Sequence, residues 1–232
     1  VQAAVASWQT AEYKKDWGLE AMGAANAYAL GFNGRSVTVR VMDSGALLQK
    51  HPDLTGDRFS ATHVKGEYST TGNRYPQGAL EQFEGNYKAG DTYDITGDWK
   101  LNVNDSHGTH VLGTVGANRD GNQFHGVAWG ANIISGNTGG TDDSNYGPFL
   151  DPGYFLNAWT TLADAVNEGN NGRGGVINNS FGTNTRITIE KKPTSDAEAE
   201  AWNAKLVASE GERHHTWKKD KKGNWLLYGP DN

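Results

Sequence analysis

The sequence contains no cysteine among its 232 residues. Disulfide bonds, thiolate metal sites and cysteine-protease chemistry are therefore excluded. No stretch approaches the roughly 20 consecutive apolar residues that span a bilayer, so we expect no membrane span. The first six residues, 1–6, are too short and too uncharged for a signal peptide, which is compatible with a mature or trimmed N-terminus.

Positive charge is also scarce, because the formal net charge is -6 and the pI is about 5.6. The one basic cluster, Lys218 to Lys222, is interrupted by Asp220, and we interpret it as a solvated turn. We therefore expect no nucleic-acid partner. What the chain does have is 31 glycines, 8 tryptophans and 9 tyrosines, a loop-rich and aromatic composition in a length suited to one substantial domain.

Apolar patterning alternates between strand and helix along most of the chain. The β-branched run Val37–Met42 predicts a buried strand that delivers Asp43 at its carboxyl end. Because strands and helices alternate, the expected fold class is α/β, an open parallel sheet with flanking helices. Further strands are predicted over 131–135 and 176–181, and helices over 17–31, from Ser106 onward and over 155–166.

Two regions depart from this alternation. Residues from about 54 to 104 lose apolar periodicity and greatly exceed the usual ~4–6-residue connection, which predicts an excursion of loops that can include a hairpin. After residue 182, an Ala/Glu-rich helical run over 195–209 precedes a charged stretch with a turn at Gly223-Asn224. We therefore expect a core over 17–182 and a polar, peripheral tail over 183–232, with the sheet incomplete at its C-terminal side.

Asp43 and His107 have complementary chemistry in this arrangement. A carboxylate at the tip of a buried strand can be held still, fix a histidine tautomer and stabilise the imidazolium. A histidine in the first turn of a helix can project from the same sheet edge and act as a general base. Asp43 fits the first role and His107 the second.

Each motif taken alone has another interpretation. Asp43-Ser44-Gly45 is also a common turn sequence. His107 and His110, with Asp105 nearby, can be metal ligands, although the helical H-E-x-x-H motif places its histidines at i and i+4. Neither motif decides the chemistry by itself.

Taken together, the two motifs resemble those of the subtilisin-like serine proteases (subtilases). Residues 39–45 are similar to the aspartate motif of that family, and residues 107–116 to its histidine motif. The order Asp then His is the order found in subtilisin. Segments 17–19, 125–128 and 176–182 extend the resemblance, so it covers about residues 17 to 182.

The resemblance implies that Asp43 orients and His107 is the general base, while His110 is a structural histidine. The start of the core and the long excursion are similar to the secreted autotransporter subgroup. That similarity implies a secreted or cell-surface location.

The resemblance also implies a substrate-binding segment of Ser180, Phe181 and Gly182. Its strand edge is expected to pair with the backbone of an extended peptide. Phe181 then shapes a subsite wall, with an ordinary core position as the alternative.

The nucleophile of such an enzyme is not found in this sequence. A subtilase needs a serine in a Gly-Thr-Ser context and, before it, an asparagine that stabilises the oxyanion. Asn137 precedes the Ser180 strand, whereas the family places that asparagine afterwards, and Ser195 and Ser209 lack flanking glycines. Because loss of the serine of subtilisin costs about 10⁶ in kcat, the chain alone is predicted to be inert. We expect it to be the N-terminal part of a longer protease.

The sequence thus predicts a serine endopeptidase by lineage, with a peptide or protein substrate and the missing C-terminal part as its partner. Two other classes stay open: a non-catalytic peptide-binding fragment or scaffold, and a metal-dependent hydrolase that uses His107, His110 and Asp105. No cofactor is expected. A structural calcium at Asp142-Asp143 or within 91–94 is an alternative to solvated loop acids, although no EF-hand-like ligand spacing occurs there.

Overall fold

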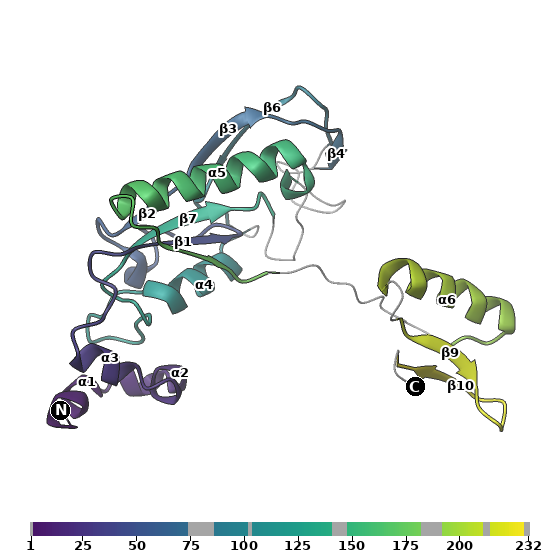
Figure 1. Cartoon of the computed structure of the whole chain (residues 1–232), viewed down its shortest axis with the longest axis horizontal. Helices are drawn as coiled ribbons and strands as arrows, with labels where there is room; N and C mark the ends of the chain where they lie inside the picture. Colours follow the sequence, from purple (N-terminus) through teal and green to yellow (C-terminus); the bar gives the residue numbers. More distant parts are fainter. Residues whose placement is uncertain are drawn as a thin grey trace. The chain divides into compact units, whose positions relative to one another are not determined.

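The computed structural model describes residues 2–73, 86–101, 104–140, 148–181, 192–210 and 214–229. The chain divides into two compact units, Val1–Ser180 and Phe181–Asn232. The first unit contains both motifs that carry chemistry. Figure 1 labels the helices and strands of each unit.

A four-stranded sheet forms the centre of the first unit. All of its neighbouring strands are parallel. The strand order is β2 (Phe59–Ala61), β7 (Asn132–Asn137), β1 (Thr38–Asp43) and β8 (Val176–Asn179). The three strands predicted from the sequence are confirmed to within about two residues. β2 was not predicted, because it is a short strand within the region that the sequence assigns to loops. It pairs with β7 of the main sheet.

The register of β1 brings polar residues together at one edge of the sheet. Asp43 lies opposite Asn137 of β7, and Met42 lies opposite Asn179 of β8. All six residues of β1 are buried, as expected for a central parallel strand. Asp43 is therefore held at the carboxyl edge, where open α/β sheets form their sites.

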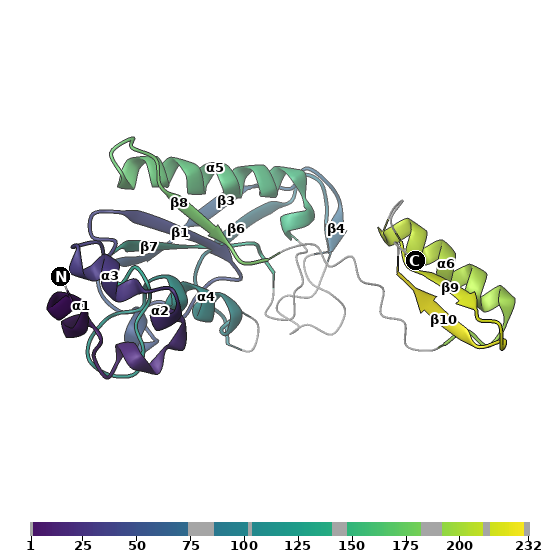
Figure 2. The same cartoon turned by 60° about the horizontal axis from the view of Figure 1, so that its bottom comes forward.

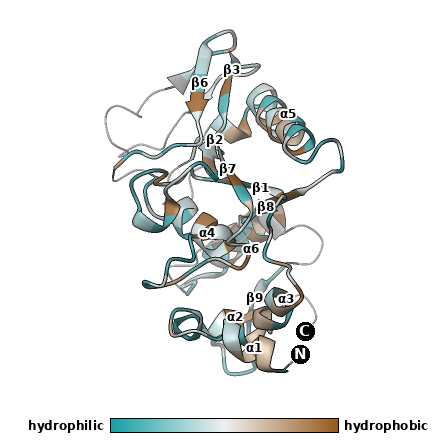
Figure 3. Cartoon of the chain, turned by 90° about the vertical axis from the view of Figure 1, so that its left-hand side faces the viewer, coloured by the Kyte–Doolittle hydropathy of each residue, from teal (hydrophilic) through white to brown (hydrophobic). Residues whose placement is uncertain are grey.

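Helices α4 (His107–Gly116) and α5 (Pro152–Gly169) lie on opposite faces of the sheet, as Figures 1 and 2 show. Val41 of β1 belongs to the same hydrophobic core as Leu112 of α4. The next residue towards the amino end, Arg40, reaches the carbonyl oxygen of Thr161 in α5. Figure 3 shows hydrophobic residues along the central strands between the two helices. The predicted α/β fold is confirmed.

Among the described residues, no helix combines the length and apolar content needed to cross a membrane. The longest of them, α5, is longer than the sequence predicts because Asp151 caps it. The Asp151 carboxylate accepts a hydrogen bond from the Tyr154 backbone N–H at 2.8 Å, and Pro152 occupies the first turn.

Short helices precede the sheet where the sequence predicts one helix over 17–31. Gly23 interrupts it with a φ of 68°, a left-handed conformation that glycine adopts readily. The aromatic rings of Tyr13, Tyr28 and Trp8 pack together around this segment. The elements are α1 (Gln2–Trp8), a 3₁₀ turn (Tyr13–Lys15), α2 (Trp17–Ala21) and α3 (Ala24–Ala29).

The excursion contains hairpin structure in its described part. β3 (His63–Glu67) pairs antiparallel with β6 (Thr92–Thr96), and β4 (Gly72–Asn73) with β5 (Asn86–Tyr87). The base of the longer hairpin is attached to the sheet, because the Thr62 N–H donates to the carbonyl oxygen of Ser135 in β7 at 2.8 Å. The described residues also form 3₁₀ helices at Pro52–Leu54 and Pro148–Leu150.

The second unit consists of α6 (Asp196–Glu210) and an antiparallel hairpin of β9 (Thr216–Lys219) and β10 (Trp225–Tyr228). Leu206 and Trp217 form part of its small core. The predicted turn is present, and Gly223 adopts a φ of 83° there. Ser195 accepts a hydrogen bond from the Glu198 N–H at 3.2 Å, so this serine caps the predicted helix.

Candidate active site

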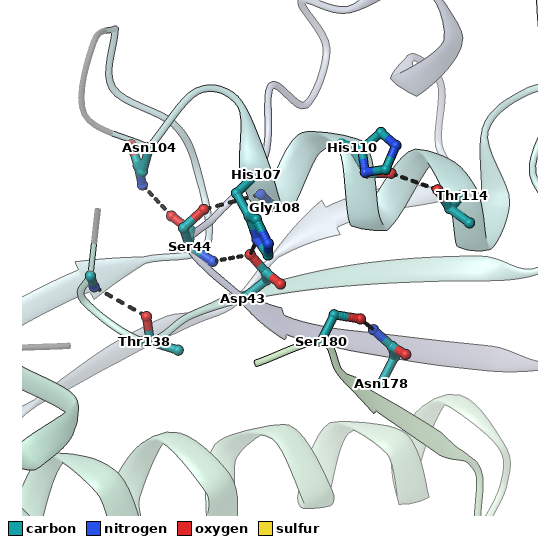
Figure 4. A network of polar contacts seen from close by, with 11 residues as sticks. Asp43, Ser44, Asn104, His107, Gly108, His110, Thr114, Thr138, Asn178 and Ser180 are labelled. Atoms are coloured by element: carbon teal, nitrogen blue, oxygen red, sulfur yellow. Dashed lines mark hydrogen bonds and ion pairs between the residues drawn. The ribbon is translucent and has the colours of Figure 1, made fainter. Parts of the chain in front are cut away.

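Asp43 and His107 form a hydrogen-bonded pair at the carboxyl edge of the sheet, as Figure 4 shows. The distance between Asp43 Oδ1 and His107 Nδ1 is 2.7 Å. Asp43 is only 4% exposed, and its Oδ1 also accepts a hydrogen bond from the Ser44 N–H at 2.7 Å. The carboxylate is therefore shielded from water and held in one orientation, as the sequence predicts.

His107 is the first residue of α4, and its side chain is 50% exposed. One ring nitrogen faces Asp43, while half of the side-chain surface is open to solvent. This arrangement fits a base that is oriented on one side and meets a reactant on the other. Ser106 occupies the predicted N-cap position, although its side chain makes no capping hydrogen bond.

Close backbone contact brings the two motifs together. The Gly108 N–H donates to Ser44 Oγ at 3.1 Å, and the Leu47 N–H donates to Thr109 Oγ1 at 2.9 Å. A Cβ atom at Gly108 would overlap the carbonyl oxygen of Gly45. Glycine at 108 therefore allows the first turn of α4 to lie directly against the turn after β1.

Asn137, at the end of the neighbouring strand β7, is occupied by structural contacts. Its Nδ2 donates to the Thr96 oxygen at 3.0 Å, and its Oδ1 accepts from the Gly139 N–H at 2.7 Å. The Tyr154 hydroxyl donates to the Asn137 backbone oxygen. These contacts agree with the rejection of Asn137 as an oxyanion-stabilising residue.

The predicted substrate-binding segment is only partly described. β8 ends at Asn179, and Ser180 follows it without strand pairing. Ser180 Oγ accepts a hydrogen bond from Asn178 Nδ2 at 2.9 Å. Phe181 is half-buried and belongs to the second unit, while Gly182 lies outside the described residues. The substrate-lining role of Ser180, Phe181 and Gly182 stays a prediction.

His110 points away from Asp43 in Figure 4 and is exposed. With Asp105 it lines a cavity of about 610 Å³ beside α4, apart from the Asp43–His107 pair. No group of three or more His, Cys, Asp or Glu side chains among the described residues could hold a metal ion. The geometry therefore offers no support to a metal-dependent hydrolase built on His107 and His110.

The acidic segments considered for calcium contribute no ligand set in the described part. Asp91 accepts a hydrogen bond from the Lys88 N–H at 2.9 Å, and Asp94 pairs with His63 and Lys65 on the exposed hairpin. Asp142 and Asp143 lie outside the described residues.

Sequence patterns did not single out Asp151, which fastens the excursion to α5. Its carboxylate accepts hydrogen bonds from the backbone N–H groups of Ser69 and Thr70 at 3.0 and 2.8 Å. Burial alone would raise the pKa of Asp151, but hydrogen bonds from Thr70, Tyr154 and Ser69 outweigh it and hold the pKa at about 2. The Asp151-Pro152 sequence, a typical helix start, was the available signal.

The sequence is similar to a known family and to known proteins over half of its length or more. Residues 34–226 match the Subtilase family, peptidase S8. Two proteins from Serratia marcescens named extracellular serine protease are 34% identical over 141 and 142 residues, which is 61% of this chain and 10% of each relative. Fervidolysin from Fervidobacterium pennivorans is 32% identical over 118 residues, 51% of this chain and 13% of the relative. The matched part thus spans about a tenth of the length of these relatives.

The region that matches the family contains the hydrogen-bonded pair. Asp43 and His107, which the sequence motifs single out, lie within the matched region and contact each other across the sheet edge. The α/β fold with its parallel central sheet is consistent with that of subtilisin. The chain therefore belongs to the subtilase family.

Proposed function

We propose that this chain supplies Asp43 and His107 to the Asp/His/Ser triad of a serine endopeptidase. The observation that carries the proposal is the 2.7 Å contact between Asp43 Oδ1 and His107 Nδ1. With Nδ1 donating to the carboxylate, Nε2 is the ring nitrogen that can accept a proton.

In the proposed reaction, His107 Nε2 takes the proton of the serine hydroxyl as the serine oxygen attacks the peptide carbonyl carbon. The same proton then passes to the leaving amine as the peptide bond breaks. Asp43 stabilises the imidazolium that exists between these transfers. This chemistry uses no cofactor, and its substrate is a peptide or a protein.

The nucleophilic serine is proposed to come from a part of the protease outside this chain. β8 pairs with β1 on one side, and no strand among the described residues pairs with its other side. Val176 of β8 is 55% exposed. A further parallel strand at this edge would continue the sheet and bring its carboxyl end to the same edge as Asp43. The chain alone is expected to be inactive.

Labelling with a fluorophosphonate probe, which reacts with activated serines, tests this function. We expect no labelling of the 232-residue chain, and both labelling and peptide hydrolysis by a longer form that carries the downstream serine. In that longer form, His107→Ala should abolish hydrolysis, whereas the control His110→Ala should retain it. Unchanged turnover of His107→Ala, or activity that a chelator removes without any probe labelling, would contradict the proposal.

A non-catalytic peptide-binding role is the second candidate, and it is favoured by the edge of β8 with which no described strand pairs. An extended peptide could pair with this edge by backbone hydrogen bonds alone. Fluorescence anisotropy with a labelled peptide separates the candidates. Binding by the isolated chain that His107→Ala leaves unchanged, together with no hydrolysis by any longer form, would favour the binding role.

We also propose that the protease is secreted. The support comes from the two Serratia marcescens relatives, whose names describe an extracellular serine protease. Membership of the autotransporter subgroup is part of the same proposal. Cell fractionation of the natural host, with an antibody to this chain, tests the location.

A further inference from the structure

Asn104 lies close to the Asp43–His107 pair, and none of its described hydrogen bonds is to either of these two residues. It is 4% exposed, and all of its described contacts are with backbone atoms. Its Nδ2 donates to the carbonyl oxygen of Ser44 and, at 3.3 Å, to that of Asp98, while its Oδ1 accepts from the Lys100 N–H at 2.6 Å. Asn104 therefore joins the 98–104 segment to the turn that follows β1.

Ser44 is the residue through which Asn104 reaches the pair, as Figure 4 shows. The Ser44 N–H donates to Asp43 Oδ1 at 2.7 Å, and Ser44 Oγ accepts from the Gly108 N–H at 3.1 Å. One residue thus contacts both the carboxylate and the helix that carries His107. The amide group of Asn104 binds a third polar group of Ser44, its carbonyl oxygen.

The packing leaves little room for this connection to shift. Gly45 has a φ of 96°, and a Cβ atom there would overlap the Asp98 carbonyl oxygen and lie 2.9 Å from Asn104 Nδ2. The Ala46 N–H also donates to the Gly97 oxygen at 3.1 Å. The turn after β1 is therefore held by the base of the excursion as well as by α4.

We propose that Asn104 is a positioning residue, which keeps Ser44 in the orientation that aligns Asp43 with His107. This inference rests on the proposed function, because it assigns a purpose to the pair. Without the Asn104 amide donor, the carbonyl oxygen of Ser44 loses this hydrogen bond, and the turn after β1 loses one of the contacts that hold it in place. Small displacements of catalytic groups of this kind reduce turnover by about 10- to 100-fold.

The opposite end of β1 offers a matched control. Asn170 is 7% exposed, its Oδ1 accepts from the Thr38 N–H at 2.7 Å, and its Nδ2 donates to the Thr38 oxygen at 3.1 Å. Both asparagines thus connect a loop to one end of the same strand. Asn104→Asp and Asn170→Asp each remove one amide donor and keep the acceptor and the side-chain size.

The low-field proton resonance of His107 Nδ1–H, measured by NMR on the 232-residue chain, is the readout. This signal reports the hydrogen bond to Asp43 and needs no serine. We expect Asn104→Asp to lose the signal, and Asn170→Asp to keep it. If Asn104→Asp keeps the signal, or if both variants lose it, the positioning role is wrong.

A second variant and the parent chain serve as controls for this experiment. If Asn104→Asp does not fold, Asn104→Ser is the second variant, because the serine side chain is too short to reach the Ser44 carbonyl oxygen and adds no charge. Retention of the signal in that variant overturns the inference. Absence of the signal in the parent chain would contradict the Asp43–His107 hydrogen bond itself, and with it both the proposed function and this inference. A normal signal in the parent and in the Asn104 variants contradicts the Asn104 inference alone.

Discussion

The imidazole of His107 donates to the carboxylate of Asp43 although 64 residues separate them in the chain. The strand β1 carries the acid and the helix α4 carries the base, and Gly108 lets the first turn of α4 lie directly against the backbone of Gly45. The Asp43–His107 hydrogen bond and the contacts of Ser44 with both motifs place the two sequence motifs in one candidate active site.

Asp43→Asn tests the electrostatic part of the pair. The amide is similar in size, but it carries no charge to stabilise the imidazolium and does not select the same histidine tautomer. In a form of the protease that carries the serine, we expect kcat to fall about 10⁴-fold with little change in KM. Steady-state hydrolysis of a peptide substrate measures this, and a loss smaller than about tenfold would argue against the role of Asp43.

Gly108→Ala tests the contact between the two motifs. The added methyl group would meet the carbonyl oxygen of Gly45, so the helix must move away from the turn after β1. We expect lower stability, by about 1–3 kcal/mol, and loss of the His107 Nδ1–H resonance. Urea unfolding and NMR of the 232-residue chain measure the two effects.

Gly113→Ala, in the same helix, is the control for this change. A Cβ atom at Gly113 meets nothing within 4 Å. Because alanine is the better helix former, this variant should be more stable than the parent by about 0.5–1 kcal/mol and keep the resonance. Equal effects of the two substitutions would show that close contact at Gly108 is unimportant.

Asp151→Asn tests the attachment of the excursion to α5. Asp151 is fully buried and accepts several hydrogen bonds, so we expect the free energy of unfolding at pH 7 to fall by about 2–3 kcal/mol. The folded-state pKa of about 2 lies below the usual 3.8, so the ionised carboxylate stabilises the fold. This contribution is complete above about pH 4 and is lost as the pH falls through 2.

Urea unfolding of the parent and of Asp151→Asn at several pH values measures that contribution. The stability difference between the two proteins should be constant from pH 7 to about pH 5 and shrink as the pH approaches 2. A difference that stays constant across the acid range would mean that the charge of Asp151 does not contribute.

Arg40→Met and Arg58→Met should change stability in opposite directions. Arg40 is fully buried, makes one 3.4 Å contact with the Thr161 oxygen, and its Nε and Nη2 have no hydrogen-bond partner among the described residues. Burial lowers the pKa of Arg40 to about 10, so its charge is unfavourable in the fold. We expect Arg40→Met to raise the free energy of unfolding by about 1–2 kcal/mol.

The control, Arg58, is also partly desolvated, and burial lowers its pKa. Its guanidinium, however, donates to the Gly116 oxygen at 3.0 Å and to Asn118 Oδ1 at 2.7 Å. Arg58→Met should therefore reduce stability by about 2 kcal/mol. Urea unfolding of both variants decides the matter, and a loss of stability in Arg40→Met equal to that in Arg58→Met would contradict the prediction.

Sequence patterns predicted the helices and strands whose formation depends on residues close together in the chain. The β-branched run before Asp43 predicts β1, and the helical spacing of Val111, Leu112 and Val115 predicts α4, because periodicity and steric preference act over a few residues. The break of the N-terminal helix at Gly23 and the addition of β2 to the sheet were missed. The helix break follows from the left-handed conformation of Gly23, whereas β2 joins the sheet by pairing with β7, which is distant in the chain.

The sequence by itself determined the chemical identity of the site: an aspartate at the end of a strand, a histidine at the start of a helix, and the motifs of one protease family. Only the tertiary structure decided that Asp43 Oδ1 and His107 Nδ1 meet, and that Ser44 and Asn104 hold them. The reason is physical. A sequence motif specifies which functional groups are present. A hydrogen bond also depends on distance and direction, and these are set only when β1, α4 and the excursion pack against one another.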